Sequence, residues 1–377
     1  MTPTSAMPFH AIGLMSGTSA DGVDGVVLAI HDGDFSILAT ETVPYPDTLR
    51  QSVRELCDRR IRRNAEAGVV EDRLNSLYAD VATRLKDKVA PVPIDIIGCH
   101  GQTVNHSPDS DPPFTLQLGN GATIARRTGI PVVSDFRSRD ISAGGQGAPL
   151  APAFHLAAFH SSCEHRAVIN IGGISNITIL PKGSDGKVIG FDIGPGNTLM
   201  DNWCSEHFSV PFDPQGSIAE SGTVQDDLLD ILLDEEYFGK EPPKSTGLEM
   251  FNPEWLDGKL RRWSGDGTYD NRDVLATLSA LTASTIGQTV NDIHPDIDTA
   301  YICGGGACNS GLMDRIRRRC RAKVLDTGSA GIDPKWVEAA AFAWMAYQTA
   351  QGRPSTLPSV TGARYPCIAG TVSQPDK

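Results

Sequence analysis

Residues 13–24 combine glycines, hydroxyl side chains and two carboxylates between two apolar stretches. The flanking residues, 9–15 and 23–30, are rich in β-forming side chains, which predicts two antiparallel strands joined by this loop. Glycines let backbone N–H groups approach a ligand closely, as an anion requires. Asp21 and Asp24 could orient water bound to a metal ion, although no dedicated metal cage is visible. The loop is therefore a first candidate site.

Glycine-rich turns recur at the ends of predicted strands. Backbone N–H groups in such turns can bind phosphate, so their repetition predicts a phosphate-binding surface. The sequence has neither a Walker-type Gly-x-x-x-x-Gly-Lys-Ser/Thr motif nor a Rossmann motif after its first strand. A nucleotide would then be held by paired hairpins rather than by a P-loop; the alternative is that the glycines only make turns. The turns lie at residues 17–22, 101, 144–147, 172–173, 194–196 and 304–306.

Asp192 is the main candidate for a general base. It ends a predicted core strand, 188–193, and is followed by Gly194-Pro195-Gly196 and a predicted helix. A carboxylate at that point can project into a cleft and take a proton from a substrate hydroxyl or a water. The alternative is that Asp192 only caps the helix.

Four further polar residues stand in apolar or glycine-rich surroundings. Glu338 lies in the first turns of the last predicted helix, where it could bind substrate or only complement the helix dipole. His100 follows a buried strand, so it could face a cleft or be a structural histidine. Arg137 and Arg139 precede the glycine-rich stretch 144–149 and suit a phosphate or a carboxylate. An ion pair between domains is the alternative for the arginines.

The predicted elements form the same series twice: three strands, a helix, a strand, a helix and a strand. Such a repeat predicts two related α/β domains with a ligand cleft between them. Residues 204–266 have no counterpart in the first half and are predicted to be a partly helical insertion. We place domain I at 1–135 plus about 355–377, and domain II at 136–354. The two series are 9–15, 23–30, 35–43, 71–89, 94–99, 122–128 and 130–136, and then 167–171, 177–181, 188–193, 274–293, 299–303, 310–321 and 322–326.

Clear start and stop signals frame the last predicted helix. Asp333 is placed to cap it, Pro334 suits its first turn, and Gly352 follows its last residue, Gln351. At 1.5 Å per residue the helix would span roughly 27 Å. The tail after it, 360–372, is rich in β-forming residues and is predicted to return to the first domain.

Composition limits the class of protein. Of 377 residues, 40% are hydrophobic and 21% charged, as in globular proteins. The net charge of −13 argues against nucleic acid or an anionic membrane as the main partner. Neither a secretory signal nor an apolar run long enough for a membrane helix is visible, so we expect a cytoplasmic protein. The 8 cysteines include no Cys-x-x-Cys pair, which favours free thiols over a zinc site or disulfides.

Seven stretches of the sequence together resemble the anhydro-N-acetylmuramic acid kinase family. They run in order from residue 11 to about 370. The resemblance implies an actin-like ATPase fold, an α/β architecture of two duplicated ribonuclease H-like domains with an interdomain cleft. The stretches are 13–24, 100–104, 135–140, 144–149, 170–176, 191–197 and 303–306.

The resemblance also implies the reaction. ATP and water convert 1,6-anhydro-N-acetylmuramic acid into N-acetylmuramic acid 6-phosphate and ADP, in peptidoglycan recycling. Water attacks the anomeric carbon and opens the anhydro bridge, while O6 takes the γ-phosphoryl group of ATP. Mg²⁺ is implied as an ion that bridges the phosphates. A homodimer is the family's expected assembly, which the sequence itself neither supports nor opposes.

The resemblance implies roles for individual residues. Asp192 matches the family's catalytic aspartate, which activates the water, and Glu338 matches a glutamate near the sugar. Binding of the sugar is predicted for His100, Gln102, Arg137, Gly194 and Asn197. Binding of ATP is predicted for Gly17, Thr18, Ser19, Ala20, Asp21, Gly22, Val23, Asp24, Gly172, Gly173, Asn176, Gly304, Gly305 and Gly306.

Two other functions stay open on the sequence. The same fold could serve a kinase for another anhydrosugar, such as levoglucosan, which lacks the lactyl and acetamido groups, or a non-catalytic nucleotide-binding protein. The carboxylate at Asp192 argues against the latter, because a binding module requires no base there. The sequence departs from the family's pattern at Asn120, where an acidic residue is usual, and at Ile193, where threonine is common. The first could change a hydrogen bond in the cleft, and the second only packing.

Overall fold

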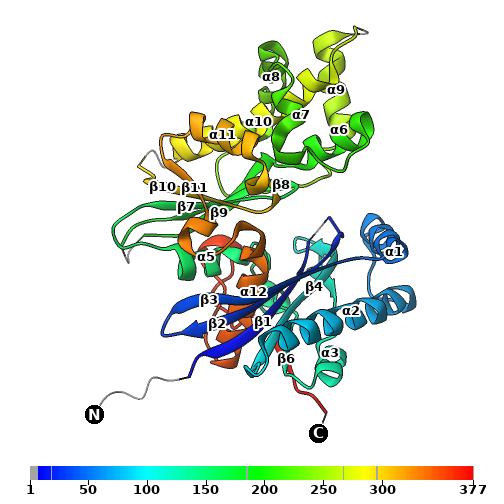
Figure 1. The fold of residues 1–377 in the computed structure, drawn as a ribbon, viewed down its shortest axis with the longest axis vertical. Helices are drawn as coiled ribbons and strands as arrows, with labels where there is room; N and C mark the ends of the chain where they lie inside the picture. Colours follow the sequence, from blue (N-terminus) through cyan, green and yellow to red (C-terminus); the bar gives the residue numbers. More distant parts are fainter. Residues whose placement is uncertain (1–6, 18, 184–185, 266, 294–295, 377) are drawn as a thin grey trace. The chain divides into compact units, whose positions relative to one another are not determined.

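The computed structural model describes residues 7–17, 19–183, 186–265, 267–293 and 296–376. Two compact units make up the chain (Figure 1). Unit 1 comprises Met1–Ala158 and Trp336–Lys377, and unit 2 comprises Phe159–Lys335. These limits differ from the expected domain boundaries, because residues 136–158 and the last helix pack with unit 1.

The sheet of unit 1 grows from the predicted opening hairpin. Its first three strands are antiparallel neighbours, and two later strands join the first strand's other side in parallel. A short strand of the C-terminal tail pairs with the edge, so the prediction that the tail returns to the first domain is confirmed. In sheet order the strands are β12 (Thr371–Ser373), β6 (Val132–Ser134), β4 (Ile96–Ser107), β1 (Phe9–Ser16), β2 (Gly22–His31) and β3 (Asp34–Pro44), with β5 (Phe114–Leu118) paired to β4.

Two long helices cover opposite faces of this sheet. Ile12 and Leu14 of β1 share a buried core with residues of α2 (Ala65–Val89). Gly13 points to the other face because side chains alternate along a strand. There it meets α12 (Val337–Ala350), so closely that a Cβ at Gly13 would lie 1.9 Å from the carbonyl oxygen of Ala339. Backbone rests on backbone at this contact, which explains why a helix that follows unit 2 in the sequence belongs to unit 1.

The last helix starts and ends close to the predicted residues. Asp333 Oδ1 accepts a hydrogen bond from the N–H of Lys335 at 2.9 Å, at the start of a 3-10 turn that leads into α12. After α12, Gly352 adopts a φ of +66°, a left-handed conformation that favours glycine. Of the other helices in unit 1, only α2 and α3 (Gly121–Thr128) were predicted; α1 (Asp47–Asp58), α4 (Ser138–Ser142), α5 (Ala151–Phe159) and α13 (Pro358–Thr361) were not.

The sheet of unit 2 repeats the strand order of unit 1. Its first strand lies in the middle, with the second and third strands antiparallel on one side and two parallel strands on the other. The predicted duplication of two α/β folding units is therefore confirmed. In sheet order the strands are β11 (Lys323–Asp326), β10 (Thr299–Cys303), β7 (Arg166–Ile171), β8 (Ile174–Leu180) and β9 (Ile189–Pro195).

Helices pack on one face of this second sheet and extend into the predicted insertion. Leu228 and Leu256 of the insertion share a hydrophobic core with Leu278 of α10 and with Ile193, whose burial agrees with a packing role. Asn120, the other departure from the family's pattern, caps α3 in unit 1 by accepting from the N–H of Thr123 at 2.9 Å. The helices of unit 2 are α6 (Thr198–Phe208), α7 (Ser217–Glu220), α8 (Asp226–Leu233), α9 (Pro253–Ser264), α10 (Asn271–Ile293) and α11 (Ser310–Arg319), with a 3-10 helix at Glu236–Gly239.

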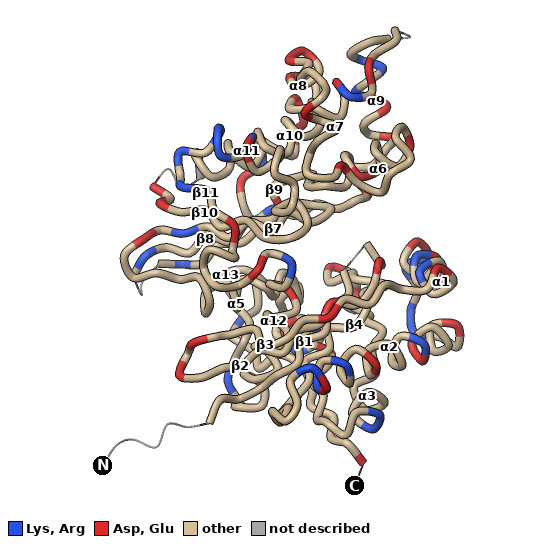
Figure 2. Tube along the Cα trace, in the orientation of Figure 1, with Lys and Arg blue, Asp and Glu red and all other residues tan. Residues whose placement is uncertain are grey.

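Charged residues are interspersed along α1 and α2 (Figure 2). Ion pairs connect them to their surroundings: Arg59 reaches Glu66 at 2.8 Å and Arg63 reaches Glu71 at 2.6 Å. Within the described residues, none of the helices has the length and apolarity that crossing a membrane demands.

Candidate functional site

A row of three polar side chains crosses the sheet of unit 2. Asn170 on β7 pairs with Asn176 on β8, and Asn176 pairs with Asp192 on β9. Directly paired residues project from the same face of a sheet, with Cβ atoms roughly 4.5–5.5 Å apart. Ile171 and Ile193 belong to the opposite face, which forms the hydrophobic core. The strands are thus apolar on one face and carry this polar row on the other.

The backbone next to Asp192 is irregular. Asn176 pairs with Asp192, whereas the preceding Ser175 pairs with Gly194, so Ile193 is the extra residue of a β-bulge. Asp192 therefore lies inside β9, whereas the sequence had placed it at the end of its strand. A bulge beside a strand residue changes the direction of its side chain and interrupts the regular pairing.

Asp192 is half-buried, and one of its carboxylate oxygens is held by the backbone. Its Oδ2 accepts a hydrogen bond from the N–H of Thr246 at 3.1 Å. Burial raises the pKa of Asp192 from 3.8 to about 6; the charge of Glu249 also raises it, and the Thr246 N–H lowers it. The following helix, α6, begins at Thr198 with Asn197 in the cap position, so Asp192 does not cap it. The carboxyl group is therefore that of a weak acid poised near neutral pH.

The turn between β7 and β8 is attached to the start of α6. The carbonyl of Gly172 accepts a hydrogen bond from the N–H of Asn197 at 2.8 Å. The carbonyl of Gly173 accepts from the N–H groups of Gly196 and Thr198 at 2.9 and 3.2 Å. These three donors are engaged within the protein, so a phosphate at this helix start would require other donors.

The glycine triplet after β10 packs against the same polar row. Gly304 has a φ of +79°, and a Cβ there would lie 2.2 Å from Asn170 Oδ1. A Cβ on Gly306 would lie 2.3 Å from Ile171 Cγ2, whereas Gly305 is exposed. Gly304 and Gly306 are thus required for close approach to β7, and Gly305 offers an open backbone surface.

The loop between β1 and β2 offers backbone more than side chains. The N–H of Ala20 donates to the carbonyl of Gly17 at 3.2 Å, which closes a turn, and Ser19 is exposed. The side chains of Ala20 and Val23 are 1% and 0% exposed and belong to the core of unit 1. Only their backbone groups could therefore contact ATP. Thr18, also predicted to bind ATP, lies outside the described residues.

The two carboxylates of this loop have separate partners. Asp21 is exposed, lies 3.9 Å from Arg54 and accepts a hydrogen bond from the N–H of Tyr45 through its carbonyl at 2.8 Å. Asp24 Oδ1 accepts from the hydroxyl of Thr42 at 2.6 Å. Gly22, which starts β2, leaves no space for a Cβ beside the neighbouring strand β3. Asp21, as an exposed carboxylate, could accept hydrogen bonds from metal-bound waters.

A buried chain of hydroxyl and amide groups, which we call the hydroxyl chain, lies under this loop. Ser16 Oγ is 2.9 Å from the hydroxyl of Tyr45 and 3.0 Å from that of Tyr78, and the Tyr45 hydroxyl is 3.1 Å from Gln102 Oε1. Because each hydroxyl donates one hydrogen, the consistent order is Tyr78 to Ser16, Ser16 to Tyr45 and Tyr45 to Gln102. Gln102 Nε2 then donates to the carbonyl of Gly17 at 3.2 Å. All four side chains are at most 2% exposed, and burial raises the pKa of Tyr45 to about 12, so they stay neutral.

His100 and Arg137 form a second buried polar group in unit 1. Arg137 Nη2 donates to His100 Nε2 at 3.0 Å, and its Nη1 donates to the carbonyl of Gly147 at 2.7 Å. His100 must therefore be neutral with its hydrogen on Nδ1, and its pKa is well below the usual value, through burial and then through the charge of Arg137. The ring packs on Phe342, with 4.5 Å between ring centroids. Within the described part of the chain, His100 Nδ1 and Arg137 Nε have no hydrogen-bond partner.

Glu338 lies in the first turn of α12, and its charge interacts with that of Arg137. Loss of hydration and then the charge of Asp24 raise the pKa of Glu338, while Arg137 lowers it. The residue nevertheless keeps an exposed surface, so solvent or a ligand can reach it. Arg137 in turn has its pKa lowered to about 10 by burial, against the opposing effect of Glu338. A carboxylate and a guanidinium thus face the same region of unit 1.

Comparison with known sequences decides the family. The sequence profile described as "Anhydro-N-acetylmuramic acid kinase" matches residues 9–375. The chain belongs to this family. It is 45% identical over 357 residues to an anhydro-N-acetylmuramic acid kinase of Nitrosomonas europaea. This alignment covers 94% of the chain and 96% of that protein. It is 43% identical over 366 residues to one of Nitrosospira multiformis, with 96% and 98% covered.

Among solved structures, the chain is similar to an activator of 2-hydroxyisocaproyl-CoA dehydratase from Clostridium difficile with bound ADPNP. The TM-score is 0.48 at 15% sequence identity, and the match covers 91% of this chain and 96% of that one.

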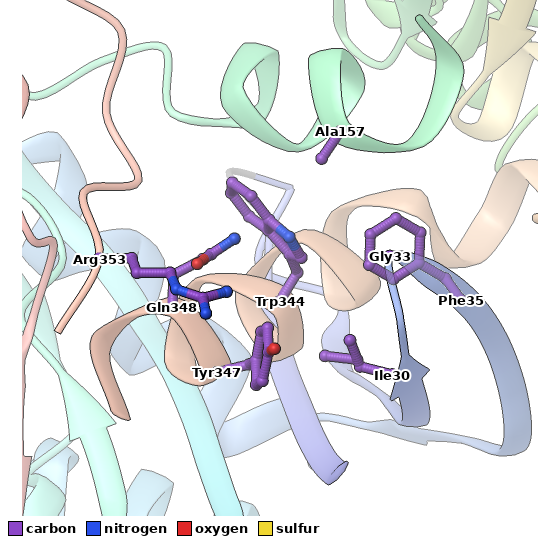
Figure 3. Close-up of a pocket in the computed structure, with 8 residues that line it drawn as sticks. All are labelled: Ile30, Gly33, Phe35, Ala157, Trp344, Tyr347, Gln348 and Arg353. Atoms are coloured by element: carbon purple, nitrogen blue, oxygen red, sulfur yellow. The ribbon is translucent and has the colours of Figure 1, made fainter. Parts of the chain in front are cut away.

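A cavity of about 190 Å³ in unit 1 contains none of the residues predicted for the kinase reaction (Figure 3). Aromatic side chains from α12 and from the β2–β3 hairpin surround it, together with an amide and a guanidinium group. Its lining residues are Ile30, Gly33, Phe35, Ala157, Trp344, Tyr347, Gln348 and Arg353.

Three residues next to Asp192 or in its polar row escaped the sequence reasoning. Asn170 could have been found, because it is polar in an apolar strand and alternates with residues that face the core. Thr246 and Tyr237, which donates to the carbonyl of Asp192 at 2.8 Å, lie in the insertion more than 40 residues after Asp192. Nothing local in the sequence connects these residues to Asp192.

Proposed function

We propose that this member of the anhydro-N-acetylmuramic acid kinase family uses ATP and water to convert 1,6-anhydro-N-acetylmuramic acid into N-acetylmuramic acid 6-phosphate and ADP. Family membership supports the substrate. The chemistry is supported by the environment of Asp192: burial raises the pKa of this carboxyl to about 6, and one of its oxygens accepts a hydrogen bond from a backbone N–H. A general base works best when its pKa lies near the working pH.

Asp192 takes a proton from the attacking water. The water oxygen then forms a bond to the anomeric carbon, and the bond from that carbon to O6 breaks. The electron pair left on O6 attacks the γ-phosphorus of ATP, and ADP leaves. Base catalysis of this kind contributes roughly 10²–10⁴-fold, and positioning with electrostatic stabilisation of the phosphoryl group supplies much of the rest.

In unit 2, backbone groups of Gly305 and the polar side chains Asn170 and Asn176 are proposed to contact ATP. In unit 1, the backbone of the loop 17–24 is proposed to bind phosphate. Among the described residues no cluster of three or more His, Cys, Asp or Glu side chains forms a metal cage. Asp21 and Asp24 fit a Mg²⁺ ion that keeps its waters and is held mainly by ATP, where it would neutralise phosphate charge.

His100, Arg137 and Glu338 are proposed to form the sugar-binding group of unit 1. The unpartnered N–H groups of His100 and Arg137 are donors that a substrate carboxylate or carbonyl could accept from. Gln102 acts indirectly in this proposal, because its Nε2 already donates hydrogen bonds to the carbonyls of Gly17 and Thr103. The cytoplasmic location stays a prediction of the sequence, and a homodimeric assembly stays a prediction of the family resemblance.

The test is turnover of the purified chain with ATP, Mg²⁺ and 1,6-anhydro-N-acetylmuramic acid in H₂¹⁸O. We expect a 6-phosphorylated product with ¹⁸O on the anomeric carbon, detected by mass spectrometry. Levoglucosan serves as the competing substrate, and a preference for it would refute the substrate assignment. Asp192→Asn is expected to lower kcat by at least about 10³ while ATP still binds. Turnover retained in that variant would refute the role of Asp192.

A further inference from the structure

Asp192 lies on an edge strand of the sheet of unit 2. β9 is the last strand in the order β11-β10-β7-β8-β9, so half of its backbone N–H and C=O groups have no strand partner. The bulge at Ile193 disturbs the pairing next to the base as well. Strand pairing alone therefore leaves the backbone of the base weakly held.

The insertion supplies the missing contacts. The N–H of Asp192 donates to the carbonyl of Lys244 at 3.2 Å, and the hydroxyl of Tyr237 donates to the carbonyl of Asp192 at 2.8 Å. With the bond from the Thr246 N–H to Oδ2, three groups of Asp192 are engaged by residues 237–246. We call these ten residues the clamp segment.

Packing and hydrogen bonds of Tyr237, Phe238 and Lys244 anchor the clamp segment. Tyr237 is 3% exposed, and Phe238 and Phe251 stack with 5.6 Å between centroids and 7° between ring planes. Lys244 donates to the carbonyls of Tyr237 and Phe238 at 3.3 and 3.2 Å. A Cβ on Gly194 would lie 2.7 Å from the Phe238 ring, so the segment lies directly against β9.

We propose that the clamp segment positions the carboxylate of Asp192 to take a proton from the attacking water, and that Tyr237 is its principal positioning side chain. This inference rests on the proposed function, since it assigns the insertion a role in the same reaction. The titratable groups that the insertion brings to this strand are Tyr237, Lys244 and Glu249. Of these, only Tyr237 places a side-chain donor on the backbone of the base.

The test compares Tyr237→Phe with Tyr269→Phe, an aromatic residue of the same unit for whose hydroxyl no hydrogen bond is seen in the described structure. Tyr237→Phe is expected to lower kcat about tenfold, the effect of one hydrogen bond of ~1.4 kcal/mol. The KM for ATP is expected to stay within about twofold, because the glycine triplet is untouched. Tyr269→Phe is expected to resemble the unmodified protein in both constants.

A second readout needs no turnover: the titration of the Asp192 carboxyl carbon followed by ¹³C NMR. Tyr237→Phe is expected to move it to higher pH, because a loosened clamp weakens the Thr246 N–H bond that favours the charged form. Glu249→Gln is expected to move it to lower pH, because a repelling charge is removed. If Tyr237→Phe changes neither kcat nor this titration, even with a lower melting temperature, the inference is overturned. Absence of sugar turnover in the unmodified protein would instead refute the proposed function, and the titration would still decide the clamp.

Discussion

Replacing Asp192 with asparagine is expected to stabilise the protein at neutral pH while it removes activity. In the folded chain burial raises the pKa of Asp192 from 3.8 to about 6. Between these two values the folded state retains a proton that the unfolded chain has released. The free energy of unfolding therefore falls as pH rises through this window, and the folded protein bears the full cost of the buried charge above pH 6.

The size of the effect follows from the shift. A difference of about two pKa units corresponds to ~3 kcal/mol at pH 7, as an upper value for a half-buried group. Asparagine has the same shape and can still accept from the Thr246 N–H, so it avoids the charge without leaving a cavity. For a unit of this size, ~3 kcal/mol raises the melting temperature by roughly 6–10 °C.

Calorimetric melting at several pH values checks this prediction. The advantage of Asp192→Asn is expected to be full at pH 7, to shrink between pH 6 and pH 4, and to vanish at pH 3. Asp257→Asn, which changes an exposed aspartate on α9 of the same unit, is the matched control. An advantage that is absent at pH 7, or one that persists unchanged at pH 3, would show that burial does not raise the pKa of this carboxyl.

Two further predictions concern unit 1. Gly13→Ala is expected to lower the free energy of unfolding in urea by about 3 kcal/mol or more, because its Cβ would overlap Ala339 and force α12 away from β1. Gly68→Ala is the control: its Cβ in α2 would have nothing within 4 Å, so the free energy of unfolding is expected to rise by up to about 1 kcal/mol. Equal effects of the two substitutions would contradict the reasoning. Tyr78→Phe, which removes the first donor of the hydroxyl chain, is expected to raise the KM for ATP severalfold at unchanged kcat and to cost about 1 kcal/mol, whereas Tyr347→Phe leaves the KM unchanged.

The fold could be predicted as far as local patterns determine it. Alternating apolar residues gave both opening hairpins, and start and stop signals gave the last helix to within a few residues. The partner of that helix could not be predicted, because it depends on Gly13 and Gly98 meeting α12 from two strands distant in the sequence. Local patterns carry no information on such long-range contacts.

The candidate site shows the same division. Asp192 stood out because a carboxylate interrupts an apolar strand. Gln102, Ala20 and Val23 were singled out by motif, and the structure places their side chains in the interior of unit 1. A motif marks a stretch of chain near a ligand, but it does not separate the residues that contact the ligand from those that support the backbone.

The two units use one strand order for two different purposes. In unit 1, the residue after the third strand is Tyr45, whose hydroxyl points inward and joins the chain that supports Gly17. In unit 2, the third strand itself carries Asp192, and its outer edge is covered by the clamp segment. The duplicated frame supplies the sheet and its strand order, yet the contacts that hold Asp192 come from the insertion, which the frame does not repeat. The acidity of Asp192 should therefore change with substitutions in residues 237–249 more than with substitutions in the repeated strands.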